Sequence, residues 1–516
     1  MKIFTPWLLF LLVLSASHPV NACSGLGAIP VQHHGRIKAF SAFAQETLQS
    51  ISGKDRWHGQ SAVDFILFNS EHPAIFLELP LIRIDHPVLK SRLGLPSGEN
   101  NFSYLKIQPA LSVLKVLVQS AAAKREKDER PSALEQQAEI LYQRFITVEH
   151  LSTGERITVI PAKVAWVSPY KTAGPQAETF KKLVRESVIN PRGSSSAVKL
   201  WSAQVAASLE PGQGTRIQLE AFYYLLRPFY YAWILYLAGF VLLLLTRPLF
   251  RSLGKYLILA GFVLHTGGLL LRWLILLRPP VANMYETMIF MDWGLMLTVG
   301  IFVVIQKRAV FLSSGALVSA LVMLYARLLP VDQSLDVLAP VLRSSYWLTV
   351  HVITIISSYS LFAFAMAVAH RHLFLSVRAK MSPQEDQLSA DTIYRLLQAG
   401  LIALGAGTIL GGVWANEAWG RFWGWDPKET WAFITFLGYM AILHLRYSKK
   451  LSNFALAVGG ILGFLLVIMT WYGVNFVLGR GMHSYGAGSG GLQWIVYFLV
   501  FEVGFLSYVG FKRRSA

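Results

Sequence analysis

The chain has 516 residues, of which 54% are hydrophobic and only 15% are charged. Soluble globular proteins of this length carry more charge, so the composition excludes that class. The net charge of +18 fits Lys and Arg gathered in the inner loops of a membrane protein, and no nucleic-acid-binding motif accompanies it, so no nucleic-acid partner is expected.

Residues 1–22 have the pattern of a signal peptide. A short basic start and an apolar run precede Val20 and Ala22, which occupy the small-residue positions of a cleavage site. An uncleaved anchor helix is the alternative, and lipidation of Cys23 is a third reading, although Asn21 is atypical of a lipoprotein signal. Each reading places the residues that follow outside the cytoplasm. Cys23 is the only cysteine, so the chain has no intrachain disulfide and no thiol pair.

Residues 23–222 are ordinary in polarity and predict a mixed α/β extracytoplasmic domain. The charged stretch Ser120–Phe145 predicts two solvated helices interrupted at Pro131. The stretch Phe145–Val167 alternates apolar and polar residues, which predicts a β-hairpin with its turn at Thr153-Gly154. The histidines of this region show no metal-ligand spacing and are expected to be surface or core residues.

Residues 223–516 predict a polytopic α-helical membrane domain. They contain about nine apolar segments that are long enough, or nearly so, to span a bilayer. These segments are residues 225–246, 256–277, 287–306, 309–326, 346–368, 393–413, 430–446, 453–476 and 492–511.

The distribution of basic residues predicts the orientation of these segments. With residues 23–222 outside, about fifteen basic residues lie in the inner loops and about six in the outer loops. The inner set is Arg247, Arg251, Lys255, Lys307, Arg308, Arg371, Arg378, Lys380, Arg395, Arg446, Lys449, Lys450, Lys512, Arg513 and Arg514. His370 and His372 fall among these inner residues and are expected to be solvated loop histidines.

The stretch "WGRFWGWDPKETWAF", Trp419–Phe433, lies on the outer side in this topology. Asp426, Pro427 and Glu429 are typical of a helix start, with Asp426 as N-cap. Tryptophans also anchor helices at membrane interfaces. Neither explanation accounts for five tryptophans within residues 414–431, namely Trp414, Trp419, Trp423, Trp425 and Trp431.

Two histidines share the predicted outer face with this loop. His351 falls just inside the outer end of the fifth segment, and His483 falls in the outer loop after the eighth. Neutral imidazole is a good axial ligand for haem iron, and flat aromatic faces suit a large planar ligand. A lone interfacial histidine is more often structural, but the histidines and the tryptophan loop together favour a haem site.

The same residues carry a family resemblance. "WGWDPKETWAFITFLGYMAILHLR", Trp423–Arg446, resembles the tryptophan-rich "WWD" signature of haem-handling proteins of cytochrome c maturation, with the CcsA (ResC-like) type as the best match. The stretches His265–Gly294 and Gly481–Gly486 resemble the same family, and Pro30–Phe40 has a looser likeness to fused synthases. The resemblance covers roughly residues 222–512.

The resemblance implies a bacterial cytoplasmic (inner) membrane protein that presents haem b at the outer, periplasmic face. His351 and His483 would be axial ligands there, beside the loop residues Trp414, Trp419, Trp423, Trp425 and Asp426. His444 would belong to a transmembrane haem site. His265 also falls in a family motif, although packing or polar bridging between helices is an equal alternative. No side chain is assigned as a catalytic acid or base.

The implied function is thioether attachment of haem to the CxxCH thiols of apocytochrome c. The chain would act as a subunit of a cytochrome c synthase (holocytochrome c haem lyase), together with a CcsB/ResB-like membrane subunit and thiol-reducing maturation proteins. A non-enzymatic haem transporter or chaperone is the alternative, and a transporter whose tryptophans are only anchors is a third. We expect a partner because His444 and His265 fall at different depths in their segments.

The predicted orientation can be tested with a cysteine at the loop. In a chain without Cys23, Ala418→Cys should react with an impermeant thiol reagent in intact spheroplasts, because the loop is expected outside. Labelling that occurs only after lysis would overturn this topology.

Overall fold

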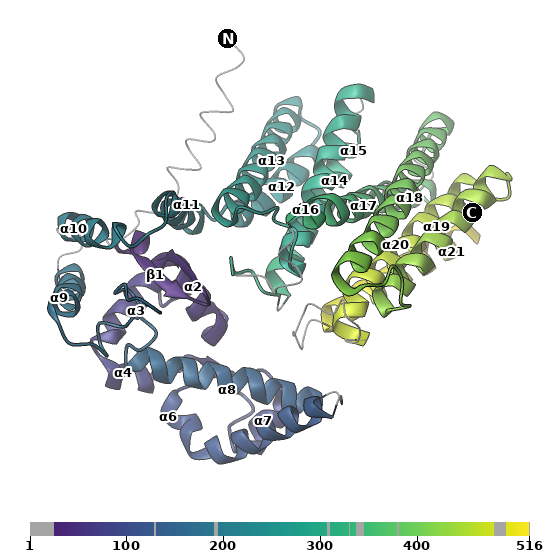
Figure 1. The fold of residues 1–516 in the computed structure, drawn as a ribbon. Coiled ribbons are helices and arrows are strands. Elements are labelled where there is room, and N and C mark those ends of the chain that lie inside the picture. Colours follow the sequence, from purple (N-terminus) through teal and green to yellow (C-terminus); the bar gives the residue numbers. More distant parts are fainter. Residues whose placement is uncertain are drawn as a thin grey trace, which may run out of the picture. The chain divides into compact units, whose positions relative to one another are not determined.

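The computed structural model describes residues 25–127, 129, 131–189, 195–306, 310–329, 331–336, 345–378, 381–478 and 492–514. These residues fall into two compact units (Figure 1). The N-terminal unit contains residues 25–226 and also residues 334–336, which come from much later in the chain. The membrane unit contains the described residues of 227–333 and those from 345 onward.

The N-terminal unit is mainly helical, with short antiparallel strand pairs. Strand β1 (Pro30–His33) pairs with β2 (Arg36–Ala39), β3 (Arg56–Trp57) with β4 (Gln60–Ser61), and β5 (Ile82–Arg83) with β6 (Asn101–Phe102). Its helices are η1 (Leu26–Ala28), α2 (Phe40–Ser52), α3 (Ala62–Ser70), α4 (Pro73–Glu78), α5 (Pro87–Arg92), α6 (Tyr104–Ile107), η2 (Gln108–Ala110), α7 (Leu111–Glu126), α8 (Ala133–Ser152), α9 (Pro175–Ile189), α10 (Ser195–Ala206) and α11 (Gln213–Leu226).

The helix break predicted around Pro131 is confirmed, because α7 ends before it and α8 begins after it. The predicted hairpin turn at Thr153-Gly154 is wrong. Residues 145–152 form the last turns of α8. This helix begins with a capping box between Ser132 and Glu135. The buried residues Leu141, Phe145 and Val148 have helical spacing. Thr153 caps this helix, so the turn signal marked a helix end.

The membrane unit contains a helix at each of the nine predicted segments. They are α12 (Pro228–Leu244), α13 (Pro248–Leu276), α14 (Met284–Gln306), α15 (Val310–Leu328), α16 (Ser345–Trp347) with η4 (Leu348–Val352) and α17 (Ile353–Ser376), α18 (Pro383–Trp419), α19 (Pro427–Tyr447), α20 (Asn453–Ile468) with η5 (Met469–Leu478), and α21 (Leu492–Arg514). By length and composition, eight described helical stretches qualify as membrane spans, and α19 is not among them. The prediction of a polytopic helical membrane protein is confirmed.

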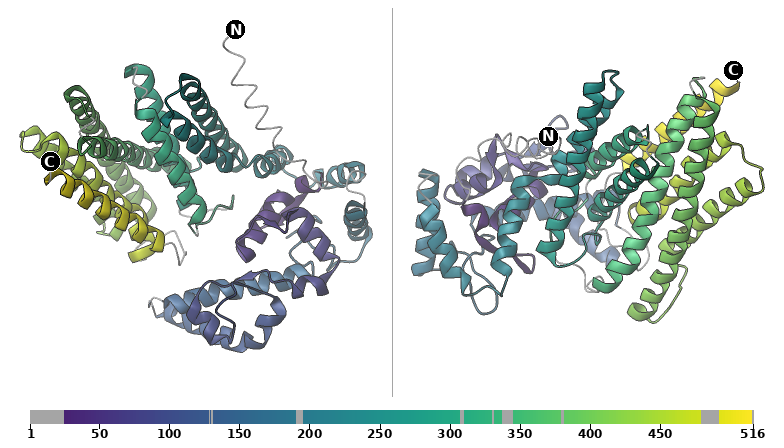
Figure 2. Two further views of the ribbon diagram at one scale, coloured as in Figure 1. Left: turned by 180° about the vertical axis from the view of Figure 1, so that it is seen from behind. Right: turned by 90° about the horizontal axis from the view of Figure 1, so that it is seen from above.

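Helix α17 lies at the centre of the membrane unit, where it packs against α14, α18 and α20 (Figures 1 and 2). Phe362 of α17 stacks on Tyr439 of α19 at a centroid distance of 3.9 Å. A side chain at Gly400 of α18 would meet the same Phe362 ring at 2.5 Å. Small residues therefore bring these helices close together, as is common in membrane proteins.

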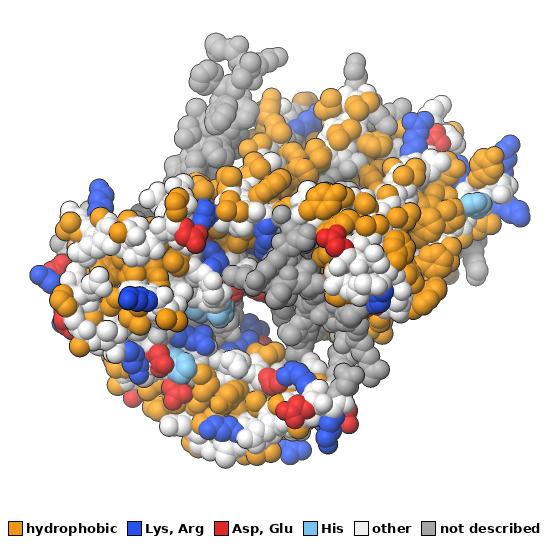
Figure 3. Space-filling model, viewed as in Figure 1, with side chains coloured by type: hydrophobic (Ala, Val, Ile, Leu, Met, Phe, Trp, Pro, Cys, Tyr) orange, Lys and Arg blue, Asp and Glu red, His pale blue; other side chains and the backbone are white. Residues whose placement is uncertain are grey.

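The two units differ in the surface that they expose. Hydrophobic side chains cover much of the visible surface of the membrane unit in Figure 3, whereas charged side chains are dispersed over the N-terminal unit. Large exposed apolar residues are frequent on α21, including Val500, Phe501 and Val503. Such a surface is suited to lipid or to another membrane subunit.

Candidate functional site

His351 lies in an irregular turn at the start of the central helix. The turn η4 is π-helical, a rare distortion that is frequent at functional sites. His351 Nδ1 is 2.8 Å from the carbonyl oxygen of Gly407 in α18. A carbonyl oxygen only accepts, so Nδ1 donates, and the neutral ring then carries its lone pair on Nε2. A hydrogen bond of this kind sets the tautomer of a metal-binding histidine.

Three positions on one face of α18 form the seat of this ring. Gly407, Gly411 and Trp414 follow one another at helical spacing. A Cβ at Gly411 would lie 2.7 Å from His351 Cε1, so only glycine leaves room for the imidazole. The Trp414 ring contacts the imidazole from the next turn, with a centroid distance of 5.7 Å.

Trp414 is a buried support for His351. It forms a small apolar cluster with Trp347, and each of the two side chains is 8% exposed. The indole Nε1 of Trp347 donates to Glu417 Oε2 at 2.6 Å, which joins the start of the fifth span to the end of α18. The expectation of an exposed aromatic face therefore does not describe Trp414.

The loop between α18 and α19 presents the other aromatic rings. Trp425 is 67% exposed, and Trp419 and Trp423 are half-buried. Trp423 and Trp425 meet edge to face, with a centroid distance of 5.8 Å and an interplanar angle of 88°. The loop therefore offers two perpendicular rings and not one flat platform.

A network around Glu429 sets the shape of this loop. The predicted helix start is confirmed, because Asp426 caps α19 and completes a capping box with Glu429. Glu429 Oε2 also accepts from the Gly424 amide at 2.8 Å. Between these anchored residues, Trp425 has a φ of 56°, a left-handed conformation that is uncommon for a bulky residue. The capping box therefore both begins α19 and holds Trp425 in its exposed position.

His444 lies near the end of α19 with its side chain exposed. Its Nδ1 donates to the Met440 carbonyl, one turn earlier, at 2.9 Å. The lone pair of its neutral ring is therefore also on Nε2. His444 and His351 share this tautomer although they lie in different helices.

His265 has different surroundings, because its ring is fully buried. Its Nε2 is 3.1 Å from the Ile289 carbonyl oxygen of α14, and its Nδ1 is 3.3 Å from the Tyr236 hydroxyl of α12. Both nitrogens thus bridge α13 to neighbouring helices. Binding a metal through either nitrogen would break one of these hydrogen bonds. His483 lies outside the described residues.

The comparisons with known proteins identify the family. Residues 281–483 match the family described as "Cytochrome C assembly protein", a range that includes His351, the tryptophan loop and His444. The chain is 38% identical over 255 residues to the cytochrome c biogenesis protein CcsA of Prochlorococcus marinus strain MIT 9301, covering 43% of this chain and 81% of that protein. It is 34% identical over 297 residues to CcsA of Synechococcus sp. strain CC9605, covering 48% and 94%. The chain belongs to the CcsA family of cytochrome c biogenesis proteins.

A longer relative matches more of this CcsA-family chain. Protein NrfI of Wolinella succinogenes is 28% identical over 506 residues, which covers 90% of this chain and 54% of NrfI. The chain thus spans about half the length of NrfI. The match covers 90% of this chain, which is more than the residues from 227 onward can supply. The similarity to NrfI therefore extends into the N-terminal unit.

The sequence interpretation misplaced two histidines, which belong to the helix of the fifth span. The expectation that His370 and His372 are solvated loop residues is wrong, because α17 continues to Ser376 and His372 is buried. His370 Nε2 lies 3.0 Å from Glu502 Oε2, a buried carboxylate of α21. Glu502 is an isolated acidic residue in an apolar segment, and such a residue usually has a partner within the protein. It was therefore the sequence signal that could have indicated this contact.

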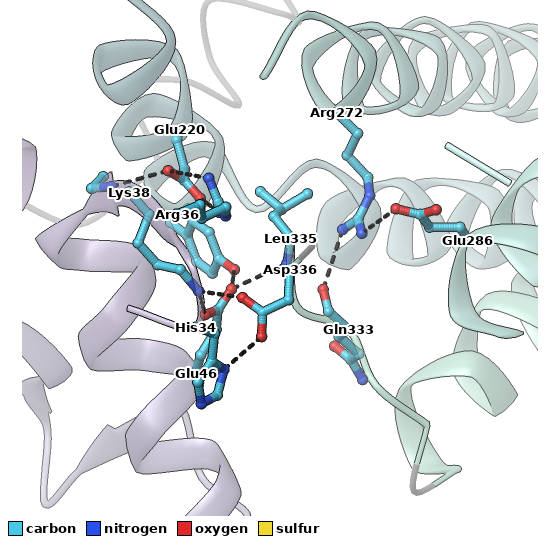
Figure 4. Close-up of polar contacts among 12 residues, drawn as sticks. His34, Arg36, Lys38, Glu46, Glu220, Arg272, Glu286, Gln333, Leu335 and Asp336 are labelled. Atoms are coloured by element: carbon cyan, nitrogen blue, oxygen red, sulfur yellow. Dashed lines mark hydrogen bonds and ion pairs between the residues drawn. The ribbon is translucent and has the colours of Figure 1, made fainter. Parts of the chain in front are cut away.

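A buried arginine–carboxylate cluster was also missed. Glu286, at the start of α14, accepts from Arg272 Nη2 at 2.8 Å and from Arg278 Nη1 at 2.7 Å. Arg272 also donates to the Gln333 carbonyl at 3.2 Å, as Figure 4 shows. Removing one partner of a buried ion pair typically costs about 3–5 kcal/mol. This cluster therefore stabilises the α13–α14 connection.

The glycine seat of His351 leads to a testable prediction. Gly411→Ala should displace the imidazole, because the new Cβ would lie 2.7 Å from its Cε1. Alanine favours a helix over glycine by about 1 kcal/mol, so the variant should fold. If His351 binds haem iron, its displacement should lower haem retention roughly tenfold or more, as measured by Soret absorbance of the purified protein.

Gly405→Ala is the matched control on the same helix. Its Cβ would meet Phe436 at 3.0 Å and would not approach His351. Equal Soret absorbance in the Gly411→Ala protein and the parent would contradict the importance of this seat.

Proposed function

We propose that this chain holds haem at the outer face of a bacterial cytoplasmic membrane, with the iron between His351 and His483, and presents it for attachment to apocytochrome c. The observation that carries the proposal is the seat of His351. Its Nδ1 is held by the Gly407 carbonyl in a π-helical turn. This directs the lone pair of the neutral ring to Nε2, the nitrogen that would bind iron.

The tryptophan loop supports the same proposal through its connection to α18. One helix supplies the carbonyl and the glycine space that orient His351, and its last residue, Trp419, leads directly into the loop. The position of the histidine is therefore coupled to that of the aromatic rings. Exposed Trp425 and the neighbouring Trp423 offer apolar surface to a planar ligand, while Trp414 supports the imidazole from behind.

The proposed reaction adds each CxxCH thiol of apocytochrome c across a vinyl group of haem. One C–S bond forms at one vinyl carbon, and the thiol hydrogen is transferred to the other. The bond count then balances without an added oxidant. Holding thiol and vinyl together would act mainly through proximity, which can supply effective molarities of roughly 10⁵–10⁸ M. The contribution of this chain would be to fix haem b while the apocytochrome approaches.

An inner haem site would need a second polypeptide. His444 lies three residues before the end of α19 at Tyr447, which is about 4.5 Å along the helix. His265 lies 17 residues from the start of α13 at Pro248 (265 − 248), or about 26 Å. In the proposed orientation both of these helix ends face inward. The distances differ too much for both histidines to bind one iron, so a CcsB/ResB-like subunit would supply the second ligand.

We predict that His351→Ala or His483→Ala lowers haem retention at the outer site and abolishes cytochrome c maturation. Added imidazole should partly restore both, because it fills the vacated coordination position. Co-expression with the partner subunit and an apocytochrome c, scored for covalent haem, provides the measurement. Covalent attachment would also distinguish a synthase subunit from a non-enzymatic haem carrier.

Exposed His72 of the N-terminal unit provides the matched control. His72→Ala should leave haem retention and maturation at parental values. Normal maturation in both the His351→Ala and the His483→Ala proteins would show that the ligand assignment is wrong.

The inner site leads to a separate prediction. In the complex with a CcsB/ResB-like subunit, His444→Ala should lose inner-site haem, whereas His265→Ala should retain it, because both nitrogens of His265 bridge helices. Haem content of the purified complex measures the difference. Full synthase activity from this chain alone, in a host without its own maturation system, would refute the need for a partner.

A further inference from the structure

His444 lies in the last turn of α19, where most side chains are exposed. Within residues 444–450, Arg446 is half-buried and the other side chains are exposed. The ends of helices open locally more easily than their centres, because fewer buried contacts hold them. A metal ligand in such a turn keeps its position only if the end of the helix is fixed.

The backbone closes this end of α19 with a Schellman motif. Lys449 has a left-handed φ of 55°, and its amide donates to the Arg446 carbonyl at 3.0 Å. The next amide, that of Lys450, donates to the Leu445 carbonyl at 2.9 Å. Glycine usually occupies the left-handed position of this motif, and another residue keeps it only where the surroundings enforce it. The closed end of α19 therefore depends on further contacts.

The Arg446 side chain supplies such contacts by joining α19 to α20. Its Nη1 donates to the Leu451 carbonyl at 2.8 Å, and its Nη2 donates to Asn453 Oδ1 at 2.7 Å. Asn453 is the first residue of α20. The planar guanidinium makes both hydrogen bonds at once, whereas lysine has a compact ammonium group without this fork. Arg446 therefore fixes the last turn of α19 to the start of the next helix.

Asn453 extends this connection to a third helix. Its Nδ2 donates at 2.6 Å to Oδ2 of Asp386, which lies in the first turn of α18. Asp386 Oδ1 lies 3.4 Å from Nε2 of His372, a buried residue near the end of α17. The residues Arg446, Asn453 and Asp386 are called the brace below. The brace connects the end of α19 to α18 and α20, which pack against each other and against the central helix α17 (Figure 1).

The brace and His444 belong to the same turn of α19. Arg446 follows His444 by two residues (446 − 444), which is about 3 Å along the helix. The imidazole of His444 is itself held by the backbone, because its Nδ1 donates to the Met440 carbonyl. Its Nε2 therefore moves with the helix backbone. Any opening of the last turn would displace the nitrogen that is proposed to bind iron.

We propose that Arg446, Asn453 and Asp386 position His444 for the inner haem. The inference rests on the proposed function, because it takes His444 as a ligand of that haem. The three are positioning residues, since they act on the ligand through the last turn of α19. Breaking the brace frees this turn from α18 and α20, and His444 then loses its fixed place.

The first measurement follows the last turn without haem. Hydrogen exchange at the Lys449 and Lys450 amides is measured in the full chain, because both amides are bonded only while this turn is closed. Arg446→Lys or Asn453→Ala should speed exchange there about fivefold or more, since local opening controls exchange. Arg446→Lys keeps the positive charge, so the charge distribution around the helix is unchanged. Parental exchange in both variants would overturn the brace.

The second measurement follows the inner haem in the complex with the partner subunit. His351→Ala and His483→Ala are introduced together, so that retained haem reports on the inner site. In this background, Arg446→Lys or Asn453→Ala should lower the spectral signal of two-histidine haem about threefold or more, because groups that orient a metal ligand contribute to the affinity of its site. Added imidazole should restore the signal by taking the place of displaced His444.

Arg251→Lys is the matched control for Arg446→Lys. Arg251 Nε donates to the Leu245 carbonyl at 3.0 Å across the connection between α12 and α13, where no candidate ligand lies. This variant should change neither the exchange nor the spectrum. Asp386→Asn is the conservative variant, because its amide oxygen still accepts from Asn453. It should keep the signal that Asp386→Ala lowers.

His444→Ala in the same background separates failure of this inference from failure of the proposed function. If His444→Ala lowers the signal but the brace variants do not, the brace does not position His444 and the inference is overturned. A lowered signal that imidazole fails to restore means that the brace only supports folding, which also overturns it. If His444→Ala itself leaves the signal unchanged, the inner ligand assignment fails and the inference fails with it. Faster exchange together with an imidazole-restored signal supports both.

Discussion

The membrane unit depends on one constraint, which is that polar groups inside hydrocarbon must find partners within the protein. In the described structure, several such groups are paired between helices. Arg272 and Arg278 share Glu286, and His370 binds Glu502. His265 is bonded to the Tyr236 hydroxyl and the Ile289 carbonyl. These contacts join α13 to α12 and α14, and α17 to α21, so polar residues contribute to the packing of these helices.

The same constraint bears on the histidines of the membrane unit. Both ring nitrogens of His265 and of His370 contact neighbouring groups, which suits residues that join helices. His351 and His444 each donate from Nδ1 to a backbone carbonyl, which directs the ring lone pair to Nε2. The second arrangement is the one that metal-binding histidines commonly use. His351 and His444 therefore share the tautomer that the proposed ligand role requires.

Local signals in the sequence predicted much of the fold. Apolar segment length located the helices of the membrane unit, and "DPKE" predicted the start of α19 because a capping box is formed by neighbouring residues. The hairpin prediction failed because residues 145–152 fit both strand and helix periodicity, and burial of one helical face decided between them. The ion pair between Lys38 and Asp336 could not be predicted, because these residues are almost 300 residues apart and only tertiary folding brings them together. Likewise, no sequence pattern shows that Trp414 is buried behind His351.

The left-handed backbone at Trp425 has a consequence for binding thermodynamics. A conformation of this kind typically costs about 1–3 kcal/mol and persists only where the surroundings enforce it. Here the surroundings are Gly424 and Asp426, both anchored to Glu429. That cost is met when the chain folds, before any ligand arrives. A planar ligand that uses the Trp425 ring would therefore lose less conformational entropy on binding than one that must first order a mobile loop.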